Sequence, residues 1–174
     1  LRLRAAEAGD AAFVLELLNA PGFVQGIGDR GVRTLDEARD YIETRIVSSY
    51  RDHGFGMWVV TPKDDAEPLG LAGLVKRDVL PHVDVGYAFL ERAWGKGYAQ
   101  EAAAAVLAYG HGSLGLETIA AIVNPENLAS RRVLEKIGLR FIDVRQLDGW
   151  DQPRERKSTR LNSRPVGLPH ARRG

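Results

Sequence analysis

A turn containing two glycines joins a strand pattern to an alanine-rich helix pattern, and it is the best candidate for a chemical site. The apolar residues 83–90 run into Arg92-x-x-Gly95-x-Gly97-x-Ala99, and the helix pattern starts at once. In such a turn backbone N–H groups converge on an anion, and the positive end of the helix dipole adds to the attraction. The turn therefore predicts a pyrophosphate-binding site. The alternative is that the two glycines only make a tight connection.

The same turn does not fit either of two common nucleotide-binding loops. Lys96 is followed by Gly97 rather than by Ser or Thr, and the earlier glycine of a phosphate-binding P-loop is missing. The pattern G-x-G-x-x-G, typical of dinucleotide-binding folds, is also absent. Nucleotide hydrolysis and dinucleotide binding are therefore poorly supported.

Sulfur and metal chemistry find no support in the sequence. The chain has no cysteine, which excludes disulfides, thiolate metal sites and a cysteine nucleophile. His53, His82 and His111 share no metal-ligand spacing, so no metal is assigned. Any mechanism must use oxygen and nitrogen groups.

Periodic patterns on both sides of the turn predict an α/β or α+β fold, with helices packed on the faces of a sheet. Helices are expected after Asp10 as far as Pro21, from the capping-box pattern at Thr34 to Ile46, over Tyr98–Tyr109, and from Asn124 to Gly138. Strands are expected at residues 57–61, 69–75, 83–90, 118–123 and 141–144.

Length, composition and charge limit the classes of protein that the chain can represent. Its 174 residues, 44% hydrophobic and 27% charged, suit one folded domain. Residues 1–156 carry 19 basic against 23 acidic residues, a net charge of −4. An acidic body gives no footprint for nucleic acid and tolerates a cationic amine substrate. Without an apolar run long enough to span a membrane, or a signal-peptide pattern, we expect a cytoplasmic protein without a membrane partner.

Two blocks of sequence resemble one family of enzymes. The glycine turn is similar to the R/Q-x-x-G-x-G/A signature of the GNAT superfamily of N-acetyltransferases. Residues 124–139 resemble that family's N-x-x-N-x-x-S-x-x-x-L-E-K-x-G-F segment, in the family's order and at its spacing. Together with Gly86 and Tyr87, the blocks look most like the RimJ/RimL branch, whose members acetylate protein N-terminal amines or small amines. The likeness covers residues 3–145.

The resemblance implies that acetyl-CoA is the co-substrate. Backbone amides of the turn would hold its pyrophosphate, and its pantetheine arm would pair with the strand before the turn as an added strand. A backbone N–H there would polarise the thioester carbonyl. The implied coenzyme-binding residues are Val85, Tyr87, Phe89, Arg92, Trp94, Gly95, Lys96, Gly97, Tyr98, Ala99, Asn124 and Asn127. Packing is the alternative role of the two tyrosines, and a helix cap is the alternative role of Asn127.

Asp84 and Ser130 are the candidate catalytic residues that the resemblance implies. An amine is mainly protonated at neutral pH, so a base or a water chain must take its proton. Asp84 is the strand carboxylate closest to the expected thioester site and could act through a water; the alternative is a solvated or ion-paired aspartate. Ser130 could hydrogen-bond the departing thiolate. Many GNAT enzymes place a tyrosine four residues later, where this chain has Leu134.

The family's fold is a mixed, mostly antiparallel sheet flanked by about four helices, and its C-terminal end is the region in doubt. Nothing apolar enough for the last strand follows residue 144, so we expect that strand to be missing or replaced, which would leave an unpaired sheet edge. Residues 157–174 contain five Lys or Arg and no acid, and residues 156–163 resemble a translated sequencing adapter. We therefore expect the domain at residues 1–156, followed by a non-native or disordered basic tail. The alternative is a natural basic arm for nucleic acid or membrane.

The sequence as a whole predicts acetyl transfer from acetyl-CoA to a primary amine by direct attack, because no thiol is present to form an acyl-enzyme. The acceptor would be a small molecule or a protein N-terminus, bound by residues 21–33 and 78–82, whose sequences do not identify it. A monomer or a homodimer is expected. The alternative function is a non-catalytic domain that binds or senses coenzyme A.

Overall fold

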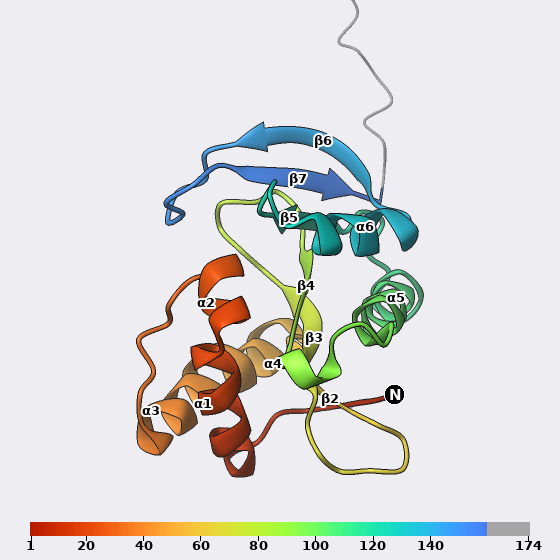
Figure 1. Cartoon of the computed structure of the whole chain (residues 1–174). Coiled ribbons are helices and arrows are strands. Elements are labelled where there is room, and N and C mark those ends of the chain that lie inside the picture. Colours follow the sequence, from red (N-terminus) through yellow and green to blue (C-terminus); the bar gives the residue numbers. More distant parts are fainter. Residues whose placement is uncertain (160–174) are drawn as a thin grey trace, which may run out of the picture.

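The computed structural model describes residues 1–159, which form one mixed sheet with helices on both faces (Figure 1). In chain order the elements are β1 (Arg2–Arg4), η1 (Ala8–Asp10), α1 (Ala11–Asn19), α2 (Pro21–Gly26), α3 (Leu35–Tyr41), η2 (Ile42–Val47), α4 (Ser48–His53), β2 (Met57–Thr61), β3 (Gly70–Val75), β4 (Asp84–Phe89), η3 (Glu91–Ala93), α5 (Tyr98–Gly112), β5 (Ala120–Val123), α6 (Leu128–Lys136), β6 (Arg140–Arg145) and β7 (Arg154–Ser158).

The seven strands follow the order β1-β2-β3-β4-β5-β7-β6. All neighbours are antiparallel except β4 and β5, which are parallel and share a single register pair, Asp84 with Ala120. The sheet therefore consists of two antiparallel halves joined at one point. The predicted mixed, mostly antiparallel sheet is confirmed.

Two hydrophobic clusters hold the helices to opposite faces of the sheet. Helix α5 packs with Val85 and Phe89 of β4 in one cluster, while α1, α3 and η2 form the other with Ala88 at its border. Because side chains of a strand alternate between faces, Asp84, Gly86 and Ala88 share the α1 and α3 face. In Figure 1 the N-terminal helices and α5 accordingly lie on different sides of the sheet.

The N-terminal helices confirm some of the expected helix-start and helix-end signals and not others. The capping box at Thr34 is present, since its hydroxyl accepts a hydrogen bond from the backbone N–H of Glu37 at 3.1 Å. Asp10 occupies the N-cap position of α1, but its carboxylate makes no cap there and pairs with Arg4 at 2.7 Å. Pro21 ends α1 as expected and also begins α2, because proline suits the first turn of a helix.

The prediction that the last strand is missing or replaced is wrong. β7 pairs with β5 on one side and β6 on the other, so neither half of the sheet lacks its strand. Buried ion pairs, rather than apolar contacts, hold this strand. Lys157 is 1% exposed, and its Nζ lies 2.8 Å from the carboxylate of Glu155. That carboxylate also lies 2.7 Å from Arg131 of α6. Lys157 and Ser158 therefore belong to the sheet. Residues 160–174, the rest of the expected tail, lie outside the described residues.

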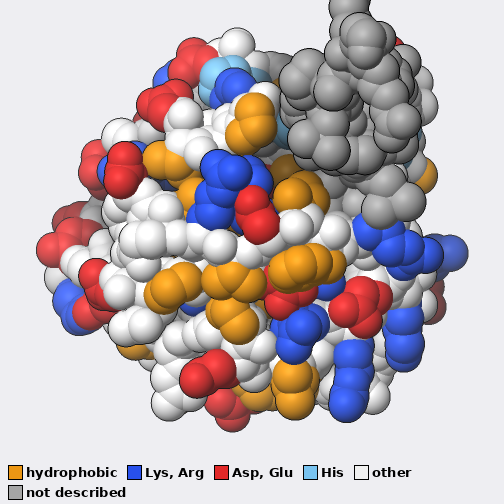
Figure 2. All heavy atoms as spheres, turned by 90° about the horizontal axis from the view of Figure 1, so that it is seen from above, with side chains coloured by type: hydrophobic (Ala, Val, Ile, Leu, Met, Phe, Trp, Pro, Cys, Tyr) orange, Lys and Arg blue, Asp and Glu red, His pale blue; other side chains and the backbone are white. Residues whose placement is uncertain are grey.

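The outer strand of the C-terminal half exposes apolar side chains. Phe141 and Val144 of β6 are 56% and 50% exposed. Viewed from above, hydrophobic side chains form a row across the middle of the surface, among basic and acidic ones (Figure 2). In the part of the chain that the structure describes, no helix is long and apolar enough to cross a membrane.

Candidate active site

The glycine turn opens α5 with its backbone donors free of side-chain acceptors. Gly95 and Gly97 have φ of +72° and +79°, a left-handed conformation that residues with a Cβ adopt only with strain. Gly97 occupies the N-cap position, and no side chain caps the helix. The first N–H groups of α5 have no partner within the helix, and an anion at this turn could accept hydrogen bonds from them.

Strands β4 and β5 separate beside this turn, and this separation is called the gap below. Beyond the pairing of Asp84 with Ala120, and a hydrogen bond of 2.9 Å from Ala120 N–H to the Val83 carbonyl, no register pair joins β4 to β5. The edge of β4 from Val85 to Phe89 is consequently left open, while its other edge pairs with β3 along its whole length. An extended chain carrying amide groups could pair with this open edge.

The side chain of Tyr87 bridges the gap on the α5 face. Its hydroxyl lies 2.7 Å from Oγ of Ser130 on α6. Burial raises the pKa of Tyr87 to about 12, so the phenol keeps its proton near neutral pH. The same hydroxyl donates a hydrogen bond to the Ser130 backbone carbonyl at 3.2 Å, and in the contact with Oγ either oxygen can be the donor. When Tyr87 donates to Oγ, the hydroxyl proton of Ser130 is available to a second acceptor. The sequence singled out both residues but did not predict that they meet.

Asn127 and Asn124 shape the start of α6. The Oδ1 of Asn127 accepts a hydrogen bond from Ser130 N–H at 3.0 Å, so the alternative role as a helix cap is present in the structure. Asn124 makes a similar contact to the N–H of Glu126, also at 3.0 Å. The amide nitrogen of Asn127 stays available to a ligand and lies toward Gly26 of α2.

Asp84 is buried and ion-paired on the opposite face of the sheet. The residue is 1% exposed, and its carboxylate oxygens lie 3.0 and 3.3 Å from Nε of Arg77. Burial raises the pKa of Asp84 to about 6, because desolvation of the charged form outweighs the opposing charge and hydrogen bond of Arg77. A carboxyl group with this pKa can take and release a proton near neutral pH.

Sequence reasoning missed Arg77. The signal that could have found it is the antiparallel register of β3 and β4, which pairs Val75 with Asp84 and brings Arg77, two residues beyond the strand, close to that carboxylate. Motif spacing does not determine a strand register, so the sequence motifs alone do not predict this pair.

Three expected residues at the turn have different surroundings. The guanidinium of Arg92 lies 2.8 Å from Glu16 and 3.1 Å from Glu67, so it is engaged by acidic groups. The indole of Trp94 donates a hydrogen bond to the Phe89 carbonyl at 2.9 Å and remains 53% exposed. Lys96 is exposed.

Helix α2 contacts the turn. A Cβ on Gly22 would lie 2.6 Å from the indole of Trp94, so only a glycine permits this approach without a shift. Of residues 21–33, which the sequence assigns to the acceptor site, Gly22 contacts the turn in this way.

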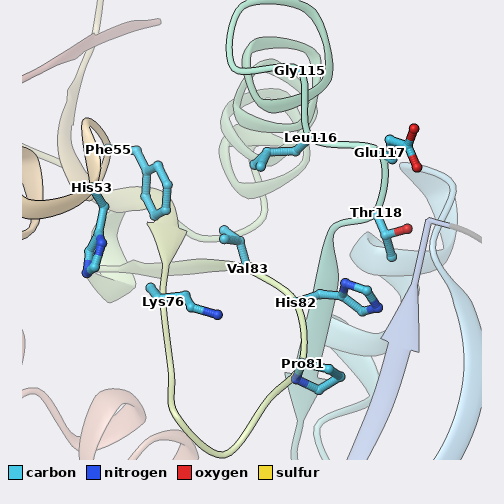
Figure 3. A pocket seen from close by; sticks show the side chains of 10 residues that line it. All are labelled: His53, Phe55, Lys76, Pro81, His82, Val83, Gly115, Leu116, Glu117 and Thr118. Atoms are coloured by element: carbon cyan, nitrogen blue, oxygen red, sulfur yellow. The ribbon is translucent and has the colours of Figure 1, made fainter.

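A cavity of about 500 Å³ lies at the other end of the sheet, where β3 ends and β4 and β5 begin (Figure 3). Its lining includes Lys76, Val83 and Thr118 beside these strand ends, with His53 and His82 at its sides. Within residues 1–159 no three His, Asp or Glu side chains are grouped so that they could hold a metal ion. No residue of the glycine turn lines this cavity, so the cavity is separate from the turn.

Comparison with known proteins places the chain in a family. The model for the Acetyltransferase (GNAT) domain matches residues 1–140. The chain therefore belongs to the GNAT acetyltransferase family, and it is an N-acetyltransferase of that family. A relative from Bacillus subtilis strain 168, the uncharacterized protein YkkB, is 34% identical over 164 residues, covering 91% of this chain and 92% of YkkB.

Solved structures share the fold. RimL, a ribosomal L7/L12 alpha-N-protein acetyltransferase solved with coenzyme A, has a TM-score of 0.76 at 16% identity and covers 90% of this chain and 91% of its own. The spermidine N-acetyltransferase of Vibrio cholerae, solved with coenzyme A and spermine, has a TM-score of 0.74 at 21% identity and covers 90% and 93%. At these identities the likeness confirms the GNAT fold.

Proposed function

We propose that this chain transfers the acetyl group of acetyl-CoA to a primary amine by direct attack in a ternary complex. The observation that carries the proposal is the parting of β4 from β5 beside the glycine turn, with Asp84 on one face and the pair of Tyr87 and Ser130 on the other. The two solved structures of this fold described above contain coenzyme A, which supports acetyl-CoA as the co-substrate.

Two parts of the chain would bind two parts of the coenzyme. Backbone N–H groups from Gly95 to Ala99 would bind the pyrophosphate, whereas the N–H of Trp94 already donates to the Glu91 carbonyl at 3.0 Å. The open edge of β4 would pair with the pantetheine arm. A backbone N–H of that edge would donate to the thioester oxygen as negative charge develops there, which is worth about 3 kcal/mol in comparable oxyanion sites. Asn127 would hold the arm through its amide nitrogen.

The chemical step needs one proton acceptor for the amine and one hydrogen-bond donor for the departing thiolate. The neutral amine attacks the thioester carbon, so a C–N bond forms as the C–S bond breaks. Asp84 takes the amine's proton through a water, and the Ser130 hydroxyl donates a hydrogen bond to the departing thiolate, supported by Tyr87. Asp84 and Ser130 lie on opposite faces of the sheet. The amine would therefore approach the thioester from one face, and the thiolate would leave toward the other.

The acceptor belongs to the class of primary amines, either a protein N-terminal amine or a small molecule. The resemblance of the sequence motifs to the RimJ/RimL branch favours that branch. RimL acts on a protein N-terminus and the Vibrio cholerae relative on spermidine, so the fold alone accommodates both kinds of acceptor.

The test is release of free coenzyme A thiol from acetyl-CoA in the presence of single amines, peptides with free N-termini, and polyamines. We expect turnover with at least one primary amine and none with the corresponding tertiary amine. Binding of acetyl-CoA without turnover of any amine would contradict the proposal and indicate a domain that binds or senses coenzyme A.

A further inference from the structure

Arg154 is a buried cation with unsatisfied hydrogen-bond donors among the described residues. It is the first residue of β7 and is 8% exposed. Within residues 1–159 its Nε and Nη1 are both buried and neither has a hydrogen-bond acceptor. Its neighbours on the same hairpin differ, since Arg145 and Arg156 both pair with Asp143, at 2.9 and 2.6 Å.

The surroundings of Arg154 compensate its charge only in part. The guanidinium carbon lies 4.6 Å from the centre of the Trp150 ring, which provides a cation–π contact but accepts no N–H in the plane of the guanidinium. Desolvation lowers the pKa of Arg154, against the opposing charge of Asp151. Leaving buried charged donors unsatisfied costs free energy, so such a group is expected to meet an acceptor that the free protein lacks.

Arg154 lies on the same face of the sheet as the proposed base. Its neighbours Glu155 and Lys157 bond to α6, so the alternation of a strand turns Arg154 to the opposite face, which is the face of Asp84. The Trp150 ring lies close to both Arg154 and the ion pair of Asp84, because the guanidinium carbon of Arg77 is 5.6 Å from the same ring centre.

Of the two guanidinium groups beside Trp150, only one is neutralised by a carboxylate. Arg77 bonds to Asp84, whereas Arg154 has no such partner among the described residues. A guanidinium presents its donors as a planar fork that matches the two oxygens of a carboxylate or a phosphate. An anionic group would therefore suit the free donors of Arg154.

We propose that the acceptor amine carries an anionic group, a carboxylate or a phosphate, which Arg154 binds while the amine reaches Asp84. The inference rests on the proposed function, because it names the class of acceptor for the same site. It also predicts discrimination against polyamines, whose additional positive charges would be repelled by Arg154.

The test compares pairs of amines that differ in one anionic group: O-phosphoethanolamine with ethanolamine, and 4-aminobutanoate with butylamine, with spermidine as the polycation. For the wild type we expect kcat/KM at least about 10-fold higher for the anionic member of a pair. In Arg154→Met that preference should be largely lost, a fall of at least about 10-fold and mainly through KM, while kcat/KM for the neutral amines is unchanged. Arg154→Lys, which keeps the charge but loses the fork, should show a partial loss.

Arg145→Met is the matched control, because Arg145 faces Arg154 in the register of β6 and β7 but is exposed and ion-paired. It should keep the preference of the wild type. Equal or better turnover of neutral amines or spermidine, or an unchanged preference in Arg154→Met, would overturn the inference and leave acetyl transfer intact.

A second measurement separates this inference from the proposed function. If acetyl-CoA binds but no amine is acetylated, the proposed function fails, and calorimetric titration of O-phosphoethanolamine and 4-aminobutanoate still decides the role of Arg154. Binding to the wild type that is lost in Arg154→Met supports the site. No binding, or equal binding to both proteins, overturns it.

Discussion

At the scale of single residues, the protonation of Asp84 decides how activity depends on pH. Its pKa is about 6, so the carboxylate predominates above that pH and can accept a proton from the bound amine. We expect kcat/KM of the wild type to fall as the pH drops below about 6. Asp84→Asn should lower kcat about 10²- to 10⁴-fold at neutral pH, the usual value of general base catalysis, without weakening acetyl-CoA binding.

The distinguishing measurement is kcat/KM against pH for both proteins, with melting temperatures recorded alongside. The deficit of Asp84→Asn should shrink toward alkaline pH, because more amine then arrives deprotonated. Arg77→Met is the companion variant: without the guanidinium that opposes desolvation, the acid limb should move to higher pH. Parallel profiles for the wild type and Asp84→Asn would remove Asp84 from the mechanism.

The partners of these residues were less predictable than the residues themselves. Asp84 and Ser130 were found through family motifs, and both lie beside the gap between β4 and β5. Their contacts to Arg77 and Tyr87 depend on strand register and on how α6 packs, which motif spacing does not encode. Arg154 escaped notice for a similar reason, since a basic residue in a basic stretch gives no sign of burial.

At the scale of elements, the turn before α5 depends on a backbone conformation that only glycine adopts readily. Gly97→Val should weaken acetyl-CoA binding at least about 10-fold, because φ of +79° is strained for a β-branched residue and the turn would leave that conformation. The control is Gly54→Val, since Gly54 has nearly the same backbone angles, φ +75° and ψ 7°, at the far end of the sheet.

Both variants should lose similar stability, because an added Cβ meets no atom within 4 Å at either position. Only Gly97→Val should lose coenzyme affinity, measured by calorimetric titration of acetyl-CoA. Normal binding by Gly97→Val would show that this turn is not the phosphate cradle.

Strand β7 makes a different prediction, because buried charges hold it. Lys157→Met should lower the free energy of unfolding by about 3–5 kcal/mol, since it leaves the carboxylate of Glu155 buried with less compensation. Lys136→Met, at an exposed position in α6, should change it by less than about 0.5 kcal/mol. Denaturant unfolding of the full chain measures both, and equal effects would contradict a sealing role for the ion pairs.

Periodicity predicted most elements, and β7 shows where it fails. The strands at residues 57–61 and 69–75 and the helix from Tyr98 have apolar faces that match their burial. β7 reads Arg-Glu-Arg-Lys-Ser, which carries no apolar signal, yet four of its five residues are buried. Its burial depends on charges contributed by α6, and such long-range compensation cannot be read from a local pattern.

At the scale of the whole molecule, the two halves of the sheet diverge from a single contact and the proposed coenzyme site lies between them. β1 to β4 carry the glycine turn and Asp84, whereas β5 to β7 carry Ser130, through α6, and Arg154. A ligand in the gap would therefore contact both halves. Only the folded chain brings these contacts together, so coenzyme binding should stabilise the whole fold.

Acetyl-CoA should therefore raise the melting temperature of the full chain. A ligand that binds only the folded state adds about 2.7 kcal/mol at 100 times its Kd, and each kcal/mol raises Tm by about 2–4 °C in a protein of this size. We expect a rise of about 5–10 °C at that concentration. S-acetyl-N-acetylcysteamine, which has the thioester but no pyrophosphate, should give a much smaller rise at the same concentration, because the turn before α5 would have no anion to bind. No rise at millimolar acetyl-CoA would contradict the coenzyme site, and equal rises from both thioesters would place the affinity in the gap rather than at the turn.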